Sequence, residues 1–144
     1  WQWQKMADYA AAHNAGDLWS RLEKVAAKQL QVGVFHGDFA PWNVKVLRDG
    51  SVHVMDWESG CAHGPPGWDW LHYMIQRATL VNHHSVPKVL DDCRVWAKSQ
   101  IGKEFLEATG WCLDVEYWLG SYLMYSSWIG GFEREELLTE WMTA

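Results

Sequence analysis

The sequence lacks the features that would direct a protein to a membrane or an oxidising compartment. No run approaches the roughly 18 apolar residues needed to cross a bilayer, and no basic-then-apolar segment marks a signal peptide at the start of the chain. The three cysteines, Cys61, Cys93 and Cys112, are widely spaced and form no C-x-x-C pair. Neither a disulfide framework nor a cysteine zinc site is therefore predicted. The protein is expected in the reducing cytoplasm, and a membrane is not expected as a partner.

Positive charge is also scarce. The chain has 12 Lys and Arg residues against 18 Asp and Glu, which gives a formal net charge of −6. A protein that binds nucleic acid regardless of sequence needs a basic patch to displace counterions, so nucleic acid is not expected as a partner. An acidic surface suits a cationic small molecule, but it is equally ordinary for a cytosolic protein, so charge alone names no ligand.

The chain is rich in apolar and aromatic residues. It has 144 residues, of which 49% are hydrophobic, and this is enough to bury one sizeable core and predicts a single domain over residues 1–144. Its 12 tryptophans predict a strongly aromatic core. Because a buried indole N–H needs a hydrogen-bond partner, some of them are expected at pocket walls or interfaces.

Apolar spacing predicts a predominantly helical chain. A first helix is expected over 3–12, and a second one, with Asp17 as its N-cap, reaches Leu30. The loop predicted over 60–66 rests on its glycines and prolines. Later helices are expected over 68–80, 86–101, 103–108, 114–129 and 133–142.

One β-hairpin interrupts the helices and makes the predicted fold class α+β. Its strands are expected over 44–47 and 52–55, and Asp49-Gly50 supplies the positive backbone angles of a tight turn between them. A shorter apolar run over 32–35 is either a brief strand or an extended entry to the segment that follows it.

The segment between that run and the hairpin carries the most specific pattern in the sequence. It reads His-x-Asp-x-x-x-x-Asn from His36 through Asp38 to Asn43, and a second aspartate, Asp56, ends the hairpin. This spacing is typical of the catalytic loop of kinases, in which one Asp orients the attacking hydroxyl and the Asn and the second Asp hold magnesium. The hairpin carries Asn43 at its start and Asp56 at its end, so these two oxygen ligands are expected side by side.

The residue types fit the chemistry of phosphoryl transfer. A carboxylate within hydrogen-bond reach of the acceptor hydroxyl can position it and accept its proton, which is the role predicted for Asp38. Magnesium prefers a few carboxylate or amide oxygens, which Asn43 and Asp56 supply. If the strand continues past Asp56, Glu58 lies on the same side and is a candidate ligand of a second metal.

Residues 33–73 resemble the C-terminal lobe of the aminoglycoside phosphotransferase and choline kinase-like small-molecule kinases, which have a protein-kinase-like fold. The resemblance rests on three segments, which are His36-Gly37-Asp38 to Asn43, Met55-Asp56-Trp57-Glu58, and Gly64-Pro65-Pro66-Gly67-Trp68-Asp69-Trp70-Leu71. Gly37 stands where protein kinases usually have Arg, which favours the small-molecule branch.

The resemblance implies an ATP-dependent transferase, with GTP as a possible alternative donor, that phosphorylates an alcohol group of a small molecule with Mg²⁺. Asp38 would be the catalytic base, Asn43 and Asp56 the magnesium ligands, and His36 and Asp69 residues that brace the loop. Aminoglycosides, choline or ethanolamine, sugars and modified nucleosides are acceptors of similar enzymes. The N-terminal nucleotide-binding lobe of these kinases is not recognisable in the sequence, so the chain is expected to be a C-terminal lobe that is inactive alone.

Two other hypotheses stay open at this stage, together with the acceptor and the oligomeric state. One is a pseudokinase or regulatory module that binds small molecules without phosphoryl transfer. The other is a carbohydrate-binding protein that uses the aromatic residues of the 114–129 segment, such as Trp118 and Trp128, although helical spacing favours core packing for them.

Overall fold

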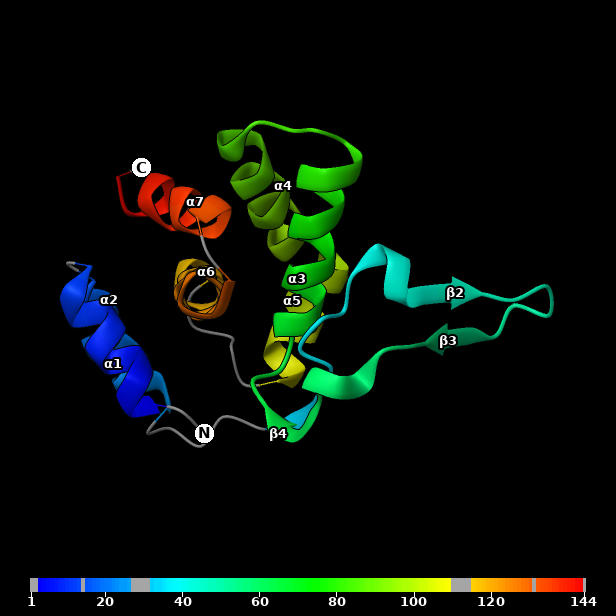
Figure 1. Ribbon diagram of the computed structural model, residues 1–144, viewed down its shortest axis with the longest axis horizontal. Helices are drawn as coiled ribbons and strands as arrows, with labels where there is room; N and C mark the ends of the chain where they lie inside the picture. The colour runs from blue at the N-terminus through cyan, green and yellow to red at the C-terminus, as the bar shows by residue number, and fades with distance from the viewer. Residues whose placement is uncertain (1–2, 14, 27–31, 110–114, 131, 144) are drawn as a thin grey trace. The chain divides into compact units, whose positions relative to one another are not determined.

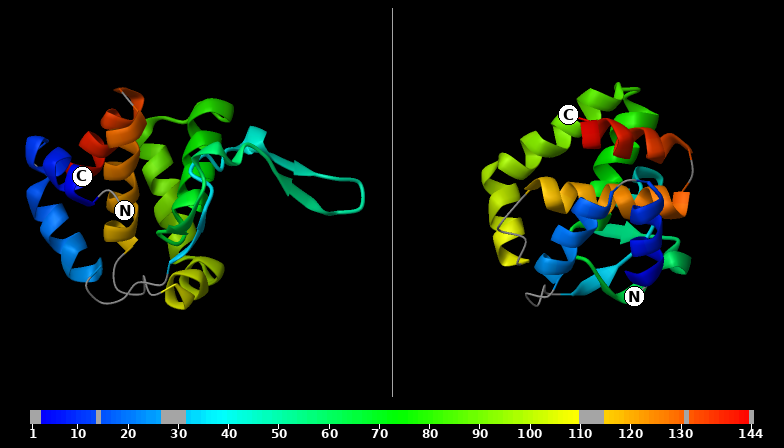
Figure 2. Two further views of the ribbon diagram at one scale, coloured as in Figure 1. Left: turned by 60° about the horizontal axis from the view of Figure 1, so that its bottom comes forward. Right: turned by 90° about the vertical axis from the view of Figure 1, so that its left-hand side faces the viewer.

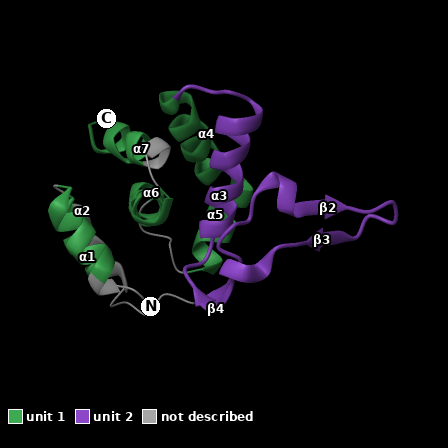
Figure 3. Ribbon diagram, in the orientation of Figure 1, with its two compact units in different colours: residues 1–30, 86–144 green, residues 31–85 purple. Residues whose placement is uncertain are grey.

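The computed structural model describes residues 3–13, 15–26, 32–109, 115–130 and 132–143. The chain divides into two compact units, one formed by residues 1–30 and 86–144 and the other by residues 31–85 (Figure 3). The described part is mostly helical with two small two-stranded sheets, which agrees with the predicted α+β class. None of its helices has the length and apolar character needed to span a bilayer.

The unit of residues 31–85 contains both sheets (Figure 1). Its elements are, in chain order, β1 (Gly33–Phe35), the 3₁₀ turn η1 (Pro41–Asn43), β2 (Val44–Val46), β3 (Val52–Val54), the 3₁₀ turn η2 (Trp57–Ser59), β4 (Cys61–Gly64), α3 (Trp68–Gln76) and the π-helical segment η3 (Arg77–Val81).

Strand β4 corrects the loop predicted over 60–66. It pairs antiparallel with β1, which settles the partner of that short apolar run. The physical reason lies in Gly64, where an added Cβ would come within 2.2 Å of the Phe35 Cβ. Because Gly64 has no side chain, the buried Phe35 side chain can pack directly against β4. In the sequence, a glycine required for such a close contact cannot be distinguished from a glycine required for a turn.

Strands β2 and β3 form the predicted hairpin (Figure 2). The turn differs from the prediction, because among the described residues of the hairpin only Gly50 has a positive φ, of 84°. The Leu47 carbonyl accepts from the Gly50 N–H at 3.0 Å, and the Leu47 N–H donates to the Ser51 carbonyl at 2.8 Å. This is a three-residue loop with a left-handed glycine. The Asp49 carboxylate accepts from the Ser51 hydroxyl and N–H, which lowers the pKa of Asp49.

Helix α3 begins where the sequence predicts, at Trp68, after Gly67 in the left-handed region. It passes at Arg77 into a π-helical segment, closed by a bond of 3.0 Å from the Asn82 N–H to the Arg77 carbonyl. The predicted helix over 68–80 is therefore present in extent, but its last turn has wider hydrogen-bond spacing.

In the other unit, all the described secondary-structure elements are helices. It contains α1 (Trp3–Ala12), α2 (Gly16–Ala26), α4 (Val86–Lys98), α5 (Gln100–Ala108), α6 (Val115–Gly130) and α7 (Phe132–Thr143). Three predicted boundaries were wrong, and one of them is the start of α5, which begins at Gln100 instead of residue 103. Asp17 lies in the first turn of α2 and is not its N-cap, and the rest of the predicted stretch to Leu30 lies outside the described residues. The helix predicted over 86–101 ends at Lys98, because the Ser99 hydroxyl accepts from the Gly102 N–H and caps α5 instead.

Helix α6 is the centre of this unit and contacts α1, α2, α4 and α7. Its buried side chains lie all round the helix rather than on one stripe, as expected for a helix with neighbours on several sides. An ion pair ties α4 to α6, since the Arg94 Nε donates to the Glu116 Oε1 at 2.9 Å. The Trp141 indole of α7 donates to the other oxygen of Glu116 at 2.9 Å.

Candidate phosphoryl-transfer site

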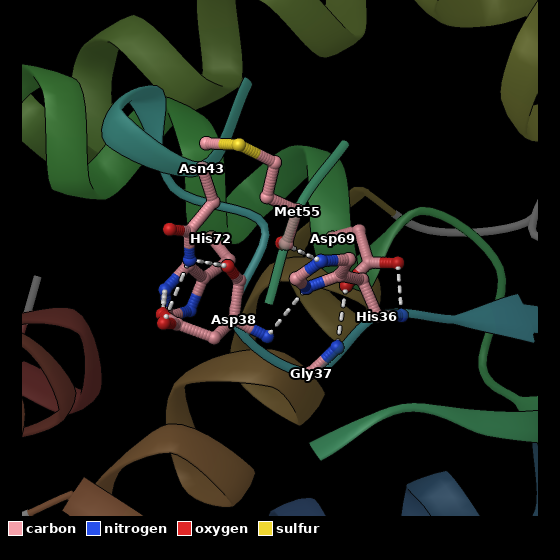
Figure 4. A network of polar contacts seen from close by, with 7 residues as sticks. All are labelled: His36, Gly37, Asp38, Asn43, Met55, Asp69 and His72. Atoms are coloured by element: carbon pink, nitrogen blue, oxygen red, sulfur yellow. Dashed lines mark hydrogen bonds and ion pairs between the residues drawn. The ribbon is translucent and has the colours of Figure 1, made fainter. Parts of the chain in front are cut away.

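The loop from His36 to Asn43 joins β1 to the hairpin, and His36 is its buried anchor, only 1% exposed. The His36 Nδ1 accepts from the Asp38 N–H at 3.2 Å, and the ring Nε2 lies 2.8 Å from the Met55 carbonyl (Figure 4). Since a carbonyl only accepts, Nε2 carries the hydrogen and Nδ1 carries none. The neutral ring thereby connects the loop to the residue that precedes Asp56.

Asp69, in the first turn of α3, holds the same loop by its backbone. Its carboxylate accepts from the His36 N–H at 2.7 Å and from the Gly37 N–H at 3.1 Å. Burial raises the pKa of Asp69, and the two backbone hydrogen bonds oppose that shift. Gly37 has a φ of 85°, and a Cβ there would come within 2.7 Å of the Ser59 carbonyl oxygen, so the loop is held close to η2 at this point.

Both oxygens of the Asp38 carboxylate have hydrogen-bond partners. The Asn43 side-chain amide donates to Asp38 Oδ2 at 3.0 Å and also to the Asp38 carbonyl at 2.9 Å. The His72 Nε2 lies 3.1 Å from Asp38 Oδ1. The Asp38 side chain is still 42% exposed, so part of the carboxylate remains accessible to a substrate.

The hairpin brings Asn43 and Asp56 into neighbouring positions, as its topology predicts. The Met55 N–H donates to the Asn43 carbonyl at 2.9 Å, and Val44 pairs with Val54 one step along the ladder. Asp56 follows Met55 directly, has a left-handed φ of 65° and is exposed. A positive φ is uncommon for a residue with a side chain and is concentrated at functional sites.

These two residues present suitable oxygens for a hard cation. Both donors of the buried Asn43 amide point to Asp38, which leaves its Oδ1 as an acceptor with no hydrogen-bond partner among the described residues. Magnesium in phosphoryl-transfer sites is held by one or two carboxylates while it keeps waters and phosphate oxygens. An amide oxygen and the exposed Asp56 carboxylate match that donor set. No group of three or more His, Cys, Asp or Glu side chains in the described ranges is arranged as a metal site.

The extended geometry that suggested Glu58 as a ligand of a second metal is not present. Strand β3 ends at Val54, and Trp57–Ser59 forms the 3₁₀ turn η2. The alternation that would place Glu58 on the side of Asp56 therefore does not apply, because it holds only in extended backbone. Glu58 is exposed, and its metal role stays a prediction without that support.

His72 is the site residue that the sequence reasoning missed. On α3, His72 lies three residues after Asp69, and Tyr73 lies four residues after Asp69. Residues at i, i+3 and i+4 share one face of a helix. Each of these three contacts the loop, with Asp69 at the His36 and Gly37 N–H groups, His72 at Asp38, and the Tyr73 ring 5.9 Å from that of Phe39. The shared helical face after a known loop contact was the available signal.

Of the aromatic residues proposed for sugar binding, Trp118 and Tyr122 lie in the core, whereas Trp128 is partly exposed. Trp118 is 0% exposed, and its ring packs 5.6 Å from that of Trp96. Tyr122 is also buried. A buried aromatic ring has no face to offer a sugar, which supports the packing interpretation for these two residues.

The comparison with protein families agrees with this geometry. The model described as "Phosphotransferase enzyme family" matches residues 1–81, more than half of the 144-residue chain. The chain belongs to this phosphotransferase family. The matched part contains the loop, the hairpin and all of α3, so every predicted site residue of this phosphotransferase lies within it. Comparisons with curated proteins and with solved structures gave no significant match.

Proposed function

We propose that this phosphotransferase moves the γ-phosphate of ATP to a hydroxyl group of a small molecule, with Asp38 at the acceptor and magnesium held by Asn43 and Asp56. The observation that carries the proposal is the linked arrangement of these three residues. The Asn43 amide bonds the Asp38 carboxylate at 3.0 Å, and the Asn43 carbonyl bonds the residue before Asp56 at 2.9 Å.

Each residue has a distinct role in the proposed reaction. Asp38 accepts a hydrogen bond from the acceptor hydroxyl, directs its oxygen toward the γ-phosphorus and takes its proton as the new oxygen–phosphorus bond forms and the bond to the β,γ-bridging oxygen breaks, which releases ADP. Asn43 and Asp56 would hold the magnesium ion through one amide and one carboxylate oxygen. The ion would supply positive charge against the charge that develops on the phosphoryl oxygens.

The proposal extends to architecture and substrates. The unit of residues 31–85 supports the assignment of the chain to the C-terminal lobe of a protein-kinase-like fold, because it combines the loop, the hairpin and the helix after it. The lobe that binds ATP, or GTP in its place, is assigned to sequence outside these 144 residues. The acceptor is a small alcohol such as an aminoglycoside, choline, ethanolamine or a sugar, and the proposed location is the cytoplasm, where the nucleotide is available.

The test uses the protein at its natural length. Radiolabelled ATP and Mg²⁺ are incubated with a panel of these acceptors, and label transferred to each acceptor is measured. For the best acceptor, Asp38→Asn is expected to lower kcat by about 10²–10⁴-fold, the usual contribution of a positioned base. Asp49→Asn, in the exposed turn of the same hairpin, is the matched control and should retain activity because Asn can keep the turn bond to Ser51.

Transfer that persists in Asp38→Asn at the rate of the control would disprove the assigned base. A second measurement needs no acceptor, because Mn²⁺ can replace Mg²⁺ and its free concentration is read by electron paramagnetic resonance. Asp56→Asn and Asn43→Leu should each weaken Mn²⁺ binding in the presence of ATP, whereas Asp49→Asn should not. Equal affinity in all of these proteins would argue against the metal assignment.

A further inference from the structure

His72 contacts the proposed base from a rigid and buried position. The residue is 4% exposed, lies within α3, and has its Nε2 3.1 Å from Asp38 Oδ1. We propose that His72 is a positioning residue, which fixes the plane of the Asp38 carboxylate so that it meets the acceptor hydroxyl. This inference rests on the proposed phosphoryl-transfer function.

The orientation of an aspartate carboxylate is weakly set by its own torsions. The last torsion of Asp is a broad, roughly two-fold rotor, so the backbone of the loop fixes where the carboxylate lies but not how it is turned. One hydrogen bond to Oδ2, from Asn43, still allows the group to swing about that contact. A second donor at Oδ1, on the other side of the group, removes this freedom.

The direction of the hydrogen bond follows from the chemistry of its partner. An ionised carboxylate can only accept, so the His72 Nε2 must carry the hydrogen that points to Asp38. A carboxylate offers about four lone-pair positions, and two of them are used by Asn43 and His72. The positions that remain are on a side chain that is 42% exposed, where an acceptor hydroxyl can reach them.

Helix α3 gives His72 the rigidity that such a role requires. Asp69, one turn earlier on the same face, bonds the backbone of the loop at 2.7 and 3.1 Å. The helix therefore fixes the loop backbone and the Asp38 carboxylate from one element. Catalytic groups held to this degree lose about 10²-fold in rate when they are displaced by about 1 Å.

A histidine that only fills space would give a different result in a matched set of variants. His72→Leu keeps the apolar volume and removes the donor, whereas His72→Gln keeps an N–H donor on a side chain of similar reach. His53→Gln, on the exposed face of β3, is the control for the substitution itself. Transfer to the best acceptor of the panel is measured with MgATP for all of them, and folding is followed by thermal denaturation.

His72→Leu is expected to lower kcat by about 10²-fold while KM for MgATP changes by less than about threefold, because ground-state binding does not depend on the carboxylate plane. His72→Gln should recover at least about tenfold of that loss, and His53→Gln should match the wild type. In an Asp38→Asn background, His72→Leu should have no further effect, since it acts through Asp38. Wild-type kcat in a folded His72→Leu, or equal losses in folded Leu and Gln variants, overturns the proposal.

If His72→Leu does not fold, nuclear magnetic resonance of the wild-type protein labelled with ¹⁵N-histidine decides the point. The His72 Nε2 should be the protonated nitrogen, and its resonance should move in Asp38→Asn but not in His53→Gln. An unprotonated Nε2 overturns the proposal. The Asp38→Asn assay separates the two ideas, because activity that survives it disproves the proposed role of Asp38 at the acceptor, whereas its loss together with full activity in His72→Leu removes only the role of His72.

Discussion

Gly37 provides a sharp test of how closely the loop must pack against the segment that follows Asp56. Replacing Gly37 with alanine introduces two separate costs. The residue has a φ of 85°, and the added Cβ would lie 2.7 Å from the Ser59 carbonyl oxygen and 2.9 Å from the Ser59 Cβ. Real Cβ atoms do not approach other heavy atoms so closely, so the loop or η2 must move.

The unit of residues 31–85 also contains a matched control that has the left-handed backbone without the close approach. Gly50 has a φ of 84°, but no heavy atom lies within 4 Å of a Cβ built on it. Gly50→Ala should therefore lower the free energy of unfolding by the left-handed strain only, about 1–2 kcal/mol. Gly37→Ala should lose that amount and about 1–3 kcal/mol more from overpacking against Ser59.

The difference is large enough to measure by urea and thermal denaturation followed by far-ultraviolet circular dichroism. For a chain of this length, 1–3 kcal/mol corresponds to a melting temperature lower by about 4–12 °C in Gly37→Ala than in Gly50→Ala. Phosphoryl transfer should fall only in Gly37→Ala, because Ser59 and Asp56 belong to the same short segment. Equal losses of stability in the two variants, within about 0.5 kcal/mol, would refute the packing argument.

Three further predictions concern the helical unit and the thiols. Burial alone would raise the pKa of Glu116, but hydrogen bonds from its arginine partner and from Trp141 hold it below its usual value. A lowered folded-state pKa means that stability present above the ordinary value of 4.5 is lost as pH falls through the folded-state value. Because the Glu116 side chain is 42% exposed, the loss should be only about 0.5–1 kcal/mol, and urea titrations should find it absent in Glu116→Gln. Gly120→Ala should destabilise α6 by about 1–3 kcal/mol although helix propensity favours alanine by about 1 kcal/mol, because its Cβ would lie 2.5 Å from the Trp141 ring, and Trp141→Leu should relieve this cost. Burial raises the pKa of the Cys93 thiol to about 12, so with the third cysteine replaced by serine, a disulfide reagent at pH 8 should modify the partly exposed Cys61 first, and equal rates would contradict this.

Local signals in the sequence predicted the elements that depend on local physics. The hairpin followed from two alternating apolar runs around Asp49-Gly50, and its pairing then placed Asn43 next to the segment of Asp56. The helices followed from apolar spacing, and α1 has the predicted bounds of Trp3–Ala12. Such patterns survive in the fold because each is set by neighbours a few residues away.

Errors arose where a residue has a structural role that the surrounding apolar pattern does not reveal. Gly64 was interpreted as part of a loop, but its role is to admit Phe35, 29 positions earlier, against β4. Ser99 reads as an ordinary polar residue within a helical pattern, and only its bond to the Gly102 N–H shows that a new helix starts there. The Gly64 contact depends on the path of the chain, whereas the Ser99 cap is local but is masked by apolar spacing that continues across it.

In the candidate site, some residues could be predicted from their spacing in the sequence, whereas other contacts depend on the path of the chain. The residues proposed to bear the chemistry, Asp38, Asn43 and Asp56, were predicted from their spacing because the kinase loop is a local motif followed by a local hairpin. The proposed alignment of Asp38 rests instead on its contact with His72, which is 34 positions away. Once Asp69 is known to bond the loop backbone, helical periodicity restricts the next contacts from α3 to positions three and four residues later, and His72 is the one of these that can donate to a carboxylate. A single long-range anchor is therefore enough to extend the sequence prediction from the proposed reacting groups to the residue proposed to orient them.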